Sequence, residues 1–179
     1  MSITFELSRD PQLLQQYYTL REHCFRQELD LPAFDGSEEQ LDRCGNILIA
    51  HRHGVCVGGA RIAPSQLPVE QLRGFDLVPE TCCAWERFVL DPAIRTVQLA
   101  RDFLAQLIEM SRVLGYRHAL MFSSQLNARF YRQCHTALGV GFQIHETTPD
   151  NSQGPFAGLE HYLSVSQLQE KLSPLRLAA

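Results

Sequence analysis

Two segments of the chain carry apolar residues at the spacing of a helix face. Across residues 99–114 the apolar positions are separated by 4, 4, 3 and 4, and Gly115 follows where such a helix is expected to end. A similar pattern starts at Asp10-Pro11, where proline suits the first helical turn, and fades near Pro32. These segments predict two long helices that each bury one face.

Short apolar runs bounded by turn residues predict strands. The clearest pair covers residues 47–52 and 55–62, with His53-Gly54 between them as a tight hairpin turn. The other predicted elements are strands at residues 3–7, 84–90, 118–122, 141–145 and 159–165, helices at residues 125–134 and 166–173, and connections at residues 32–46 (with a short helical piece) and 63–81.

The predicted order of elements is β-α-β-β-β-α-β-α-β-β. Strands that alternate with helices in the second half indicate at least one parallel crossover. A chain of 179 residues suits one ordinary domain. The predicted fold class is therefore α/β (α+β), with a single domain over residues 1–179. We expect a mixed central sheet of about six to seven strands flanked by helices.

The composition narrows the class of protein. Hydrophobic residues make up 45% and charged residues 20%, which is typical of a globular protein. The formal net charge of -4 argues against nucleic acid as a partner, because phosphate binding needs a basic surface. No apolar run approaches the roughly 20 residues that span a bilayer, and residues 1–10 lack the features of a signal peptide.

The cysteines and histidines indicate neither a disulfide framework nor a metal site. The six cysteines contain no Cys-x-x-Cys pair, and the seven histidines show no metal-ligand spacing. Adjacent Cys82 and Cys83 are interpreted as small apolar side chains. The simplest expectation is a reduced, cytoplasmic protein with no metal and no tightly bound cofactor.

The most informative segment runs from Glu86 to Ala100, ERFVLDPAIRTVQLA. It is predicted to form a strand, an Asp-Pro break and the start of a helix, where free N–H groups and the helix dipole favour phosphate. The segment resembles the acyl-donor-binding motif of the GNAT acyltransferases, Arg/Gln-x-x-Gly-x-Gly/Ala. Arg95 matches its first position and Ala100 its last, while Gln98 stands at the middle glycine. The alternative is an ordinary strand–helix turn with a solvated arginine.

The GNAT resemblance implies a GNAT-like fold and an acyl-phosphopantetheine thioester as co-substrate, carried by acyl carrier protein or coenzyme A. Gln98 favours a donor with one phosphate, such as acyl carrier protein, because glycine would let the backbone approach a pyrophosphate more closely. The residues that this resemblance assigns to donor binding are Phe88, Val89, Arg95, Gln98, Leu99, Ala100 and Asn127.

A second match with GNAT proteins consists of Asn127, Tyr131 and the Gly141-Phe142 pair that enters a strand. Asn127 and Tyr131 are four residues apart, so they share one side of a helix. A tyrosine hydroxyl beside a thioester sulfur can protonate the departing thiolate, which makes Tyr131 a catalytic candidate. The alternative is that the Tyr131 ring packs in the core.

A third match lies mainly in the first half of the chain. Its six charged or aromatic residues are Arg21, Phe25, Glu39, Asp42, Arg61 and Arg87. They are similar to positions in the autoinducer synthases (LuxI type) and the related long-chain N-acyl amino acid synthases, which typically take acyl chains from acyl carrier protein. The resemblance implies that these residues bind the acceptor, with the arginines holding a carboxylate and the acids holding the arginines or an ammonium group. Scattered surface ion pairs are the alternative.

Two positions depart from the autoinducer synthases. Leu31 stands where that family has a tryptophan, and Ala84 stands where it has a glutamate. Both family residues help to form or position the S-adenosylmethionine site. The departures therefore argue against S-adenosylmethionine as the acceptor.

The resemblance also implies a mechanism. A backbone N–H near Phe88 or Val89 would stabilise the oxyanion, and Glu86 would act as the base for the amine. The alternative for Glu86 is a buried ion pair with an arginine. Candidate walls for an acyl chain, which are alternatively plain core residues, are Phe103, Leu104, Met121 and Phe122. Candidate basic residues for docking a carrier protein are Arg95, Arg101, Arg112 and Arg117.

The leading hypothesis is an N-acyltransferase that moves an acyl group from acyl carrier protein or acyl-coenzyme A to the amine of an amino acid or a related small molecule. Three alternatives stay open: an acyl-homoserine lactone autoinducer synthase, a short-chain GNAT N-acetyltransferase and a non-catalytic GNAT-like binding module. The expected partners are acyl carrier protein and a small-molecule amine, without nucleic acid.

Overall fold

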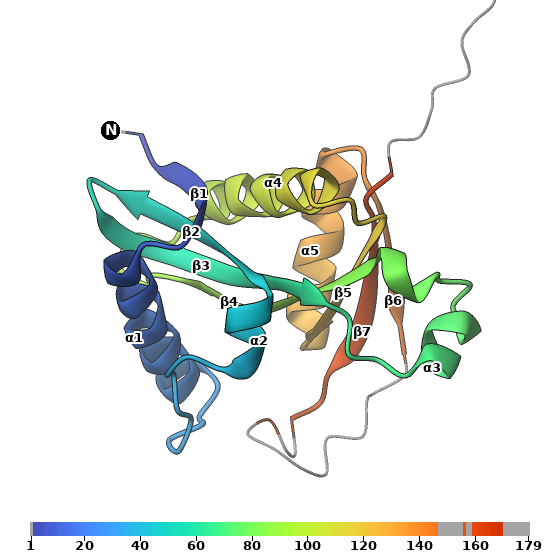
Figure 1. Cartoon of the computed structure of the whole chain (residues 1–179), viewed down its shortest axis with the longest axis horizontal. Coiled ribbons are helices and arrows are strands. Elements are labelled where there is room, and N and C mark those ends of the chain that lie inside the picture. Colours follow the sequence, from blue (N-terminus) through green and yellow to red (C-terminus); the bar gives the residue numbers. More distant parts are fainter. Residues whose placement is uncertain (1, 147–155, 157–158, 170–179) are drawn as a thin grey trace, which may run out of the picture.

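Seven strands pair into one sheet within residues 2–146, 156 and 159–169, the part of the chain that this computed structural model describes. The strands are β1 (Thr4–Ser8), β2 (Asn46–Arg52), β3 (Val55–Pro64), β4 (Cys82–Leu90), β5 (His118–Ser123), β6 (Gly141–His145) and β7 (Tyr162–Gln167). Their order across the sheet is β1-β2-β3-β4-β5-β7-β6 (Figure 1). Among these seven described strands only β4 and β5 pair in parallel, so the predicted mixed sheet with a parallel crossover is confirmed.

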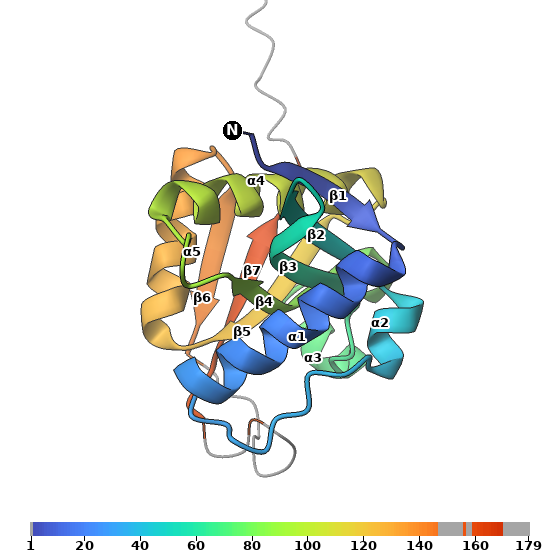
Figure 2. The same ribbon diagram turned by 90° about the vertical axis from the view of Figure 1, so that its left-hand side faces the viewer.

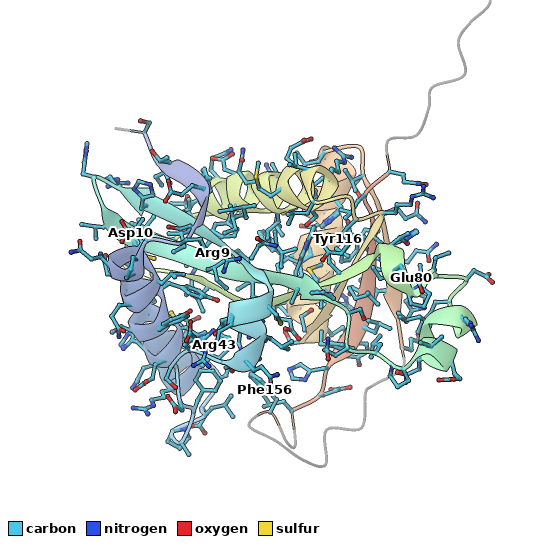
Figure 3. The ribbon with its side chains drawn as sticks, viewed as in Figure 1. Arg9, Asp10, Arg43, Glu80, Tyr116 and Phe156 are labelled. Carbon is cyan, nitrogen blue, oxygen red and sulfur yellow. The ribbon has the colours of Figure 1, made fainter. Side chains whose placement is uncertain are left out.

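Side-chain caps define where the three long helices begin. In each case an oxygen of the capping side chain accepts a backbone N–H from the first turn. The pairs are Asp10 before α1 (Pro11–Glu28), Thr96 before α4 (Val97–Val113) and Ser124 before α5 (Gln125–Ala137). Figure 3 shows Asp10 at the start of α1. Shorter helices α2 (Gln40–Cys44), α3 (Val69–Gly74) and the 3₁₀ helix η1 (Pro79–Thr81) lie in the connections.

Most of the predicted elements are confirmed, with ends shifted by a few residues. His53 and Gly54 have φ angles of 51° and 77°, as the predicted hairpin turn requires. The sequence pattern indicates no helix in residues 63–81, where α3 and η1 form. The prediction of a helix over residues 166–173 is wrong where it can be checked, because residues 166 and 167 belong to β7. Residues 170–173 lie outside the described part.

Helices cover both faces of the sheet because the central strands are apolar on both sides. Leu48 and Ala50 of β2 pack in the cluster that includes α4, while Ile47 and Ile49 pack in the cluster that includes α1. Figures 1 and 2 show α1 and α4 on opposite faces. A third apolar cluster under α3 includes Leu72 and residues of β5 and β7.

Strand β4 separates from β5 partway along its length. Parallel pairing covers only residues 82–84 of β4 and 118–120 of β5. Beyond Ala84, β4 stays paired with β3 alone. Its burial changes at the same place: residues 86–88 are only half-buried, between buried residues on either side. The separation therefore opens the middle of the sheet next to these three residues.

A β-bulge lies in this open part of β4. The register moves from Gly59 opposite Val89 to Arg61 opposite Glu86, which is two steps on β3 against three on β4. The bulge contains Arg87, whose backbone lies in the left-handed region with a φ of 56°. A bulge at this point turns the backbone and re-aims the side chains and amides around Arg87.

The ring of Tyr17 from α1 packs directly on Gly59 of β3. A Cβ atom at Gly59 would overlap the Tyr17 ring, and Tyr17 is 0% exposed, so the ring has no free space to move into. We expect Gly59→Ala to lower the free energy of unfolding by about 1–3 kcal/mol, measured by chemical denaturation. Gly74→Ala is the control, because nothing lies within 4 Å of a Cβ at Gly74. Equal effects of the two substitutions would contradict this prediction.

Candidate active site

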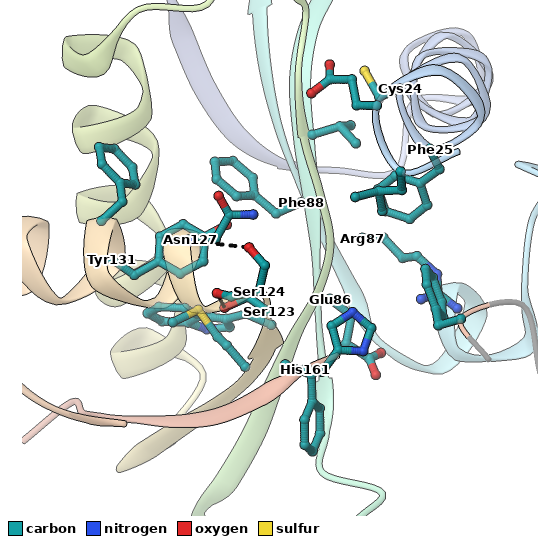
Figure 4. A pocket seen from close by; sticks show the side chains of 18 of the residues that line it. Cys24, Phe25, Glu86, Arg87, Phe88, Ser123, Ser124, Asn127, Tyr131 and His161 are labelled. Carbon is teal, nitrogen blue, oxygen red and sulfur yellow. Dashed lines mark hydrogen bonds between the residues drawn. The ribbon is translucent and has the colours of Figure 1, made fainter. Parts of the chain in front are cut away.

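A cavity of about 590 Å³ lies where β4 separates from β5. Its size is that of a small-molecule site. Residues from both sides of β4 line it, from α1 on one face and from α4, β5 and α5 on the other. Figure 4 shows Tyr131, Asn127 and Ser124 on one side of the strand and Phe25 and Cys24 on the other. Two reactants could therefore meet across the backbone of β4.

The side of the cavity below α4 is largely apolar. Trp85 and Phe88 of β4 face Ala100, Leu104 and Leu107, which recur at helical spacing on α4. Of the candidate acyl-chain walls, Leu104, Met121 and Phe122 line the cavity. Phe103 does not, because its fully buried ring packs between Phe5 and Phe88.

The backbone of β4 directs the Phe88 N–H toward this apolar side. The Tyr17 hydroxyl donates to the carbonyl oxygen of Arg87 at 2.9 Å, so that carbonyl points toward α1. In a trans peptide the N–H points the opposite way, which directs the Phe88 N–H toward the α4 and α5 side. The Asp91 N–H donates to the carbonyl of Val57 on β3, and Val89 lies opposite Gly59 of β3. Because the N–H groups of residues two apart on a strand point the same way, the Val89 N–H also points toward β3. Of the two predicted oxyanion donors, the geometry thus favours Phe88.

Tyr131 and Asn127 reach the same side of the cavity from α5. Both line it one helical turn apart, as their spacing predicts. Burial raises the pKa of Tyr131 to about 12, so its hydroxyl carries a proton at neutral pH. The ring centroid of Tyr131 lies 6.3 Å from that of Phe88. The Tyr131 ring therefore lies near the side chain of the residue that carries the Phe88 N–H.

The start of α4 offers only part of a phosphate site. The Leu99 N–H donates to the Thr96 hydroxyl oxygen, and the Ala100 N–H donates to the Thr96 carbonyl oxygen. Gln98 is exposed and donates to Asp102, away from the cavity. Arg95 lines the cavity and pairs with Glu28 at 2.7 Å. A donor phosphate would therefore have to use the remaining amides of the first turn and compete with Glu28 for Arg95.

The predicted basic residues are spread along the length of α4. Arg95 precedes α4, whereas Arg112 lies in its last turn and Arg117 beyond its end, so about 25 Å of helix separates them. Arg112 is also engaged, because it donates to the carbonyl of Leu168 and pairs with Glu109. Arg95 thus lies near one end of α4, and Arg112 and Arg117 lie near the other.

Six charged residues form a single ion network next to β4. Arg21 of α1 pairs with Asp42 of α2 at 3.0 Å, and Asp42 also pairs with Arg61 of β3 at 3.0 Å. The remaining contacts join Arg61 to Glu39 and Glu86, and Glu39 to Arg87 at 2.9 Å. Three arginines and three carboxylates balance in charge. The predicted convergence of these residues is therefore observed.

Part of the ion network is fully buried, and part of it is accessible from the cavity. Arg21, Asp42 and Arg61 are at most 2% exposed, so they cannot contact an acceptor directly and instead support their neighbours. The side chains of Glu86 and Glu39 keep 28% and 29% exposure. Both hydrogen bonds from Arg61 to Glu86 reach Oε2. Both interpretations of Glu86 are thus compatible with its position, since it is ion-paired and also lines the cavity.

Electrostatics favour the charged forms of Glu39 and Arg61. Burial opposes the charge on Glu39, but Arg87 and Arg61 outweigh it and hold the pKa of Glu39 below its ordinary value. Burial likewise opposes the charge on Arg61, and Glu86 and Glu39 outweigh it and raise the pKa of Arg61. Removing one member would leave an uncompensated buried charge.

An aromatic cluster closes the α1 side of the cavity. Phe25, Phe34 and Phe156 pack with ring centroids 4.8–5.9 Å apart, and the Arg87 guanidinium lies 4.7 Å from the Phe156 ring centroid. His161 lies beside Glu86 in the same view (Figure 4) and also lines the cavity. The sequence pattern does not indicate Phe34, Phe156 or His161, because they come from loops and a strand end without a local motif.

The described residues contain no group of three or more His, Cys, Asp or Glu placed to hold a metal ion. None of the helices in this part of the chain is long and apolar enough to cross a membrane. Burial raises the pKa of Cys83 to about 12, which fits its interpretation as an apolar filler rather than a nucleophile.

Solved structures with the same architecture identify the fold. A CoA-dependent acyl-homoserine lactone synthase, BjaI, with SAM and isopentyl-CoA, has a TM-score of 0.69 and 17% identity over 94% of this chain and 83% of its own. The AHL synthase LasI has a TM-score of 0.64 and 14% identity over 95% and 90%. An acyl-CoA N-acyltransferase from Pseudomonas aeruginosa has a TM-score of 0.61 and 15% identity over 93% and 99%. The protein has the GNAT fold.

The predicted GNAT-like fold, with its mixed sheet flanked by helices, is thereby confirmed. The sequence matches no protein-family model and no curated protein. At 14–17% identity, the likeness to these GNAT-fold proteins concerns the fold and does not extend to substrates.

Removing a charge from the buried part of the ion network should destabilise the fold. Asp42→Asn removes the carboxylate shared by Arg21 and Arg61, and we expect a loss of about 3–5 kcal/mol in the free energy of unfolding. Glu38→Gln removes an exposed pair with Arg43 and should cost less than about 1 kcal/mol. Urea denaturation of both variants measures the difference. Similar losses in the two would show that the buried network adds nothing to stability.

Proposed function

We propose that the protein is an N-acyltransferase that moves an acyl group from a phosphopantetheine thioester to the amine of an amino acid or a related small molecule. The observation that carries this proposal is the cavity that crosses β4, with the Phe88 N–H and Tyr131 on one side and Glu86 and Arg87 on the other. The GNAT fold is shared with enzymes named as acyl-CoA N-acyltransferase and acyl-homoserine lactone synthase, which supports the same chemistry.

The donor would bind on the α4 and α5 side. Its acyl chain would enter the apolar space between Trp85, Leu104 and Leu107, and its phosphate would approach the start of α4. That helix start lacks the middle glycine and has Gln98 instead, which supports a donor with one phosphate, such as acyl carrier protein. Bound isopentyl-CoA in BjaI supports coenzyme A as the other carrier.

The acceptor would bind on the α1 side. Arg87 offers a cation beside the aromatic cluster for an acceptor carboxylate, and Glu86 offers a carboxylate for its amine. The amine lone pair attacks the thioester carbonyl carbon and forms the C–N bond, while the Phe88 N–H stabilises the oxyanion. Glu86, directly or through water, takes the proton lost by the amine. The C–S bond then breaks, and Tyr131 gives its proton to the departing sulfur.

Acyl-homoserine lactone synthesis is the second candidate function. The likeness in fold to BjaI and LasI favours it. Leu31 and Ala84 count against it, since they replace the tryptophan and glutamate typical of autoinducer synthases. Consumption of S-adenosylmethionine separates the two functions.

A donor and acceptor panel tests the proposal. Purified protein is incubated with medium- and long-chain acyl thioesters of acyl carrier protein and of coenzyme A, with acetyl-coenzyme A, and with pooled amino acids or S-adenosylmethionine. Mass spectrometry should detect an N-acyl amino acid made from a long-chain donor. Turnover only of acetyl-coenzyme A would assign a short-chain acetyltransferase, and no product from any donor would refute the proposal in favour of a binding module.

Tyr131→Phe tests the acid step. The substitution keeps the ring and removes the hydroxyl whose pKa burial raises to about 12, so we expect kcat to fall about 10- to 100-fold with little change in KM for the thioester. Tyr116→Phe, a tyrosine past the far end of α4 (Figure 3), is the matched control and should keep full activity. An unchanged kcat in Tyr131→Phe would rule out Tyr131 as the acid.

A further inference from the structure

The Tyr17 hydroxyl makes a contact between two distant parts of the chain at the centre of the cleft. Tyr17 lies on α1, is 0% exposed, and donates to the carbonyl oxygen of Arg87 at 2.9 Å across 70 residues of sequence. That carbonyl belongs to the β-bulge in β4. In the proposed mechanism the next amide along the strand, the Phe88 N–H, stabilises the oxyanion, so its orientation has to be held in place.

The backbone at Arg87 needs such support. Its φ of 56° lies in the left-handed region, which is strained for a residue other than glycine and persists only where neighbours hold it. Two contacts are available. The Arg87 side chain is fixed by Glu39, with hydrogen bonds of 2.9 and 3.1 Å, while its carbonyl is fixed by Tyr17.

One rigid peptide joins the Arg87 carbonyl to the Phe88 N–H. Because a trans peptide is planar, any rotation of this peptide turns the carbonyl and the N–H together through the same angle, and the two groups keep pointing in opposite directions. A carbonyl tied to Tyr17 therefore keeps the N–H aimed across the strand at the donor side. A rotated peptide would present a carbonyl oxygen there, which repels a developing oxyanion.

The surroundings of Tyr17 leave its ring in one position. Gly59 provides the space for the ring, since a Cβ there would overlap it, and the Arg21 guanidinium lies 5.3 Å from the ring centroid. Burial raises the pKa of Tyr17 well above its ordinary value, so the hydroxyl keeps its proton and can donate. The buried end of the ion network thus also packs on the tyrosine that holds the bulge.

We propose that Tyr17 is a positioning residue, which locks the Arg87–Phe88 peptide so that the Phe88 N–H points at the thioester carbonyl. This inference rests on the proposed acyl transfer. It assigns to α1 a part in stabilising the oxyanion, although Tyr17 itself touches neither substrate. Losing the hydroxyl should therefore lower kcat and leave substrate affinity nearly unchanged.

Tyr17→Phe and Tyr18→Phe form a matched pair of variants. Tyr18 is the neighbouring buried tyrosine, 8% exposed, and its ring packs against Tyr17 and Arg21. We expect kcat of Tyr17→Phe to fall about 10- to 100-fold, less than or equal to the loss of an oxyanion donor, with KM changed less than threefold. Tyr18→Phe should keep kcat within about twofold of the unsubstituted protein. A fall in kcat that is equal in both variants would overturn the proposal.

Crystal structures of the same two variants separate this inference from the proposed function. We expect the Arg87–Phe88 peptide to rotate in Tyr17→Phe and to stay in place in Tyr18→Phe. A peptide that keeps its orientation in Tyr17→Phe overturns the proposal, whatever the activity. If the peptide rotates but the unsubstituted protein transfers no acyl group from any donor, Tyr17 still positions this peptide and only the proposed function fails.

Discussion

The early separation of β4 from β5 is the constraint on which the site depends. A fully paired β4 would bond its amides to both neighbours, and no N–H would be left for a ligand. Pairing with β5 stops after Ala84, so the backbone beyond it bonds on one side only. The same separation lets residues of α1 and of α5 line one cavity across a single strand.

The ion network accounts for how an open strand keeps its shape. Two carboxylates from α2 and the residue before it, Asp42 and Glu39, reach arginines on α1, β3 and β4. Such an arrangement is costly to assemble because every charge loses water, yet it is specific, since each arginine has a carboxylate in reach. Charge balance lets the protein place Glu86 and Arg87 at the edge of the cavity without an unpaired buried ion.

The side chain and the backbone groups at the bulge point in different directions. The Arg87 side chain lies on the α1 side of the cavity, its carbonyl accepts from Tyr17, and the following N–H faces the α4 and α5 side. One residue in the left-handed region thus sets the direction of three groups. The fold shared with solved acyltransferases supplies the sheet, and these particular contacts decide what the opening in the sheet can bind.

The sequence by itself determined most of the elements and their order, because apolar periodicity, caps and turn residues act locally, as at Asp10, Gly54 and Gly115. Its motifs also carried the GNAT resemblance. It also indicated Glu86, Arg87 and Tyr131, which stand in recognisable segments. Only the tertiary structure decided that Arg21 and Arg61 are buried supports, that Phe88 rather than Val89 presents its N–H, and that Tyr17, Phe156 and His161 join the site. Those facts depend on contacts between segments far apart in the chain, and on one strand pairing over part of its length, which no local pattern encodes.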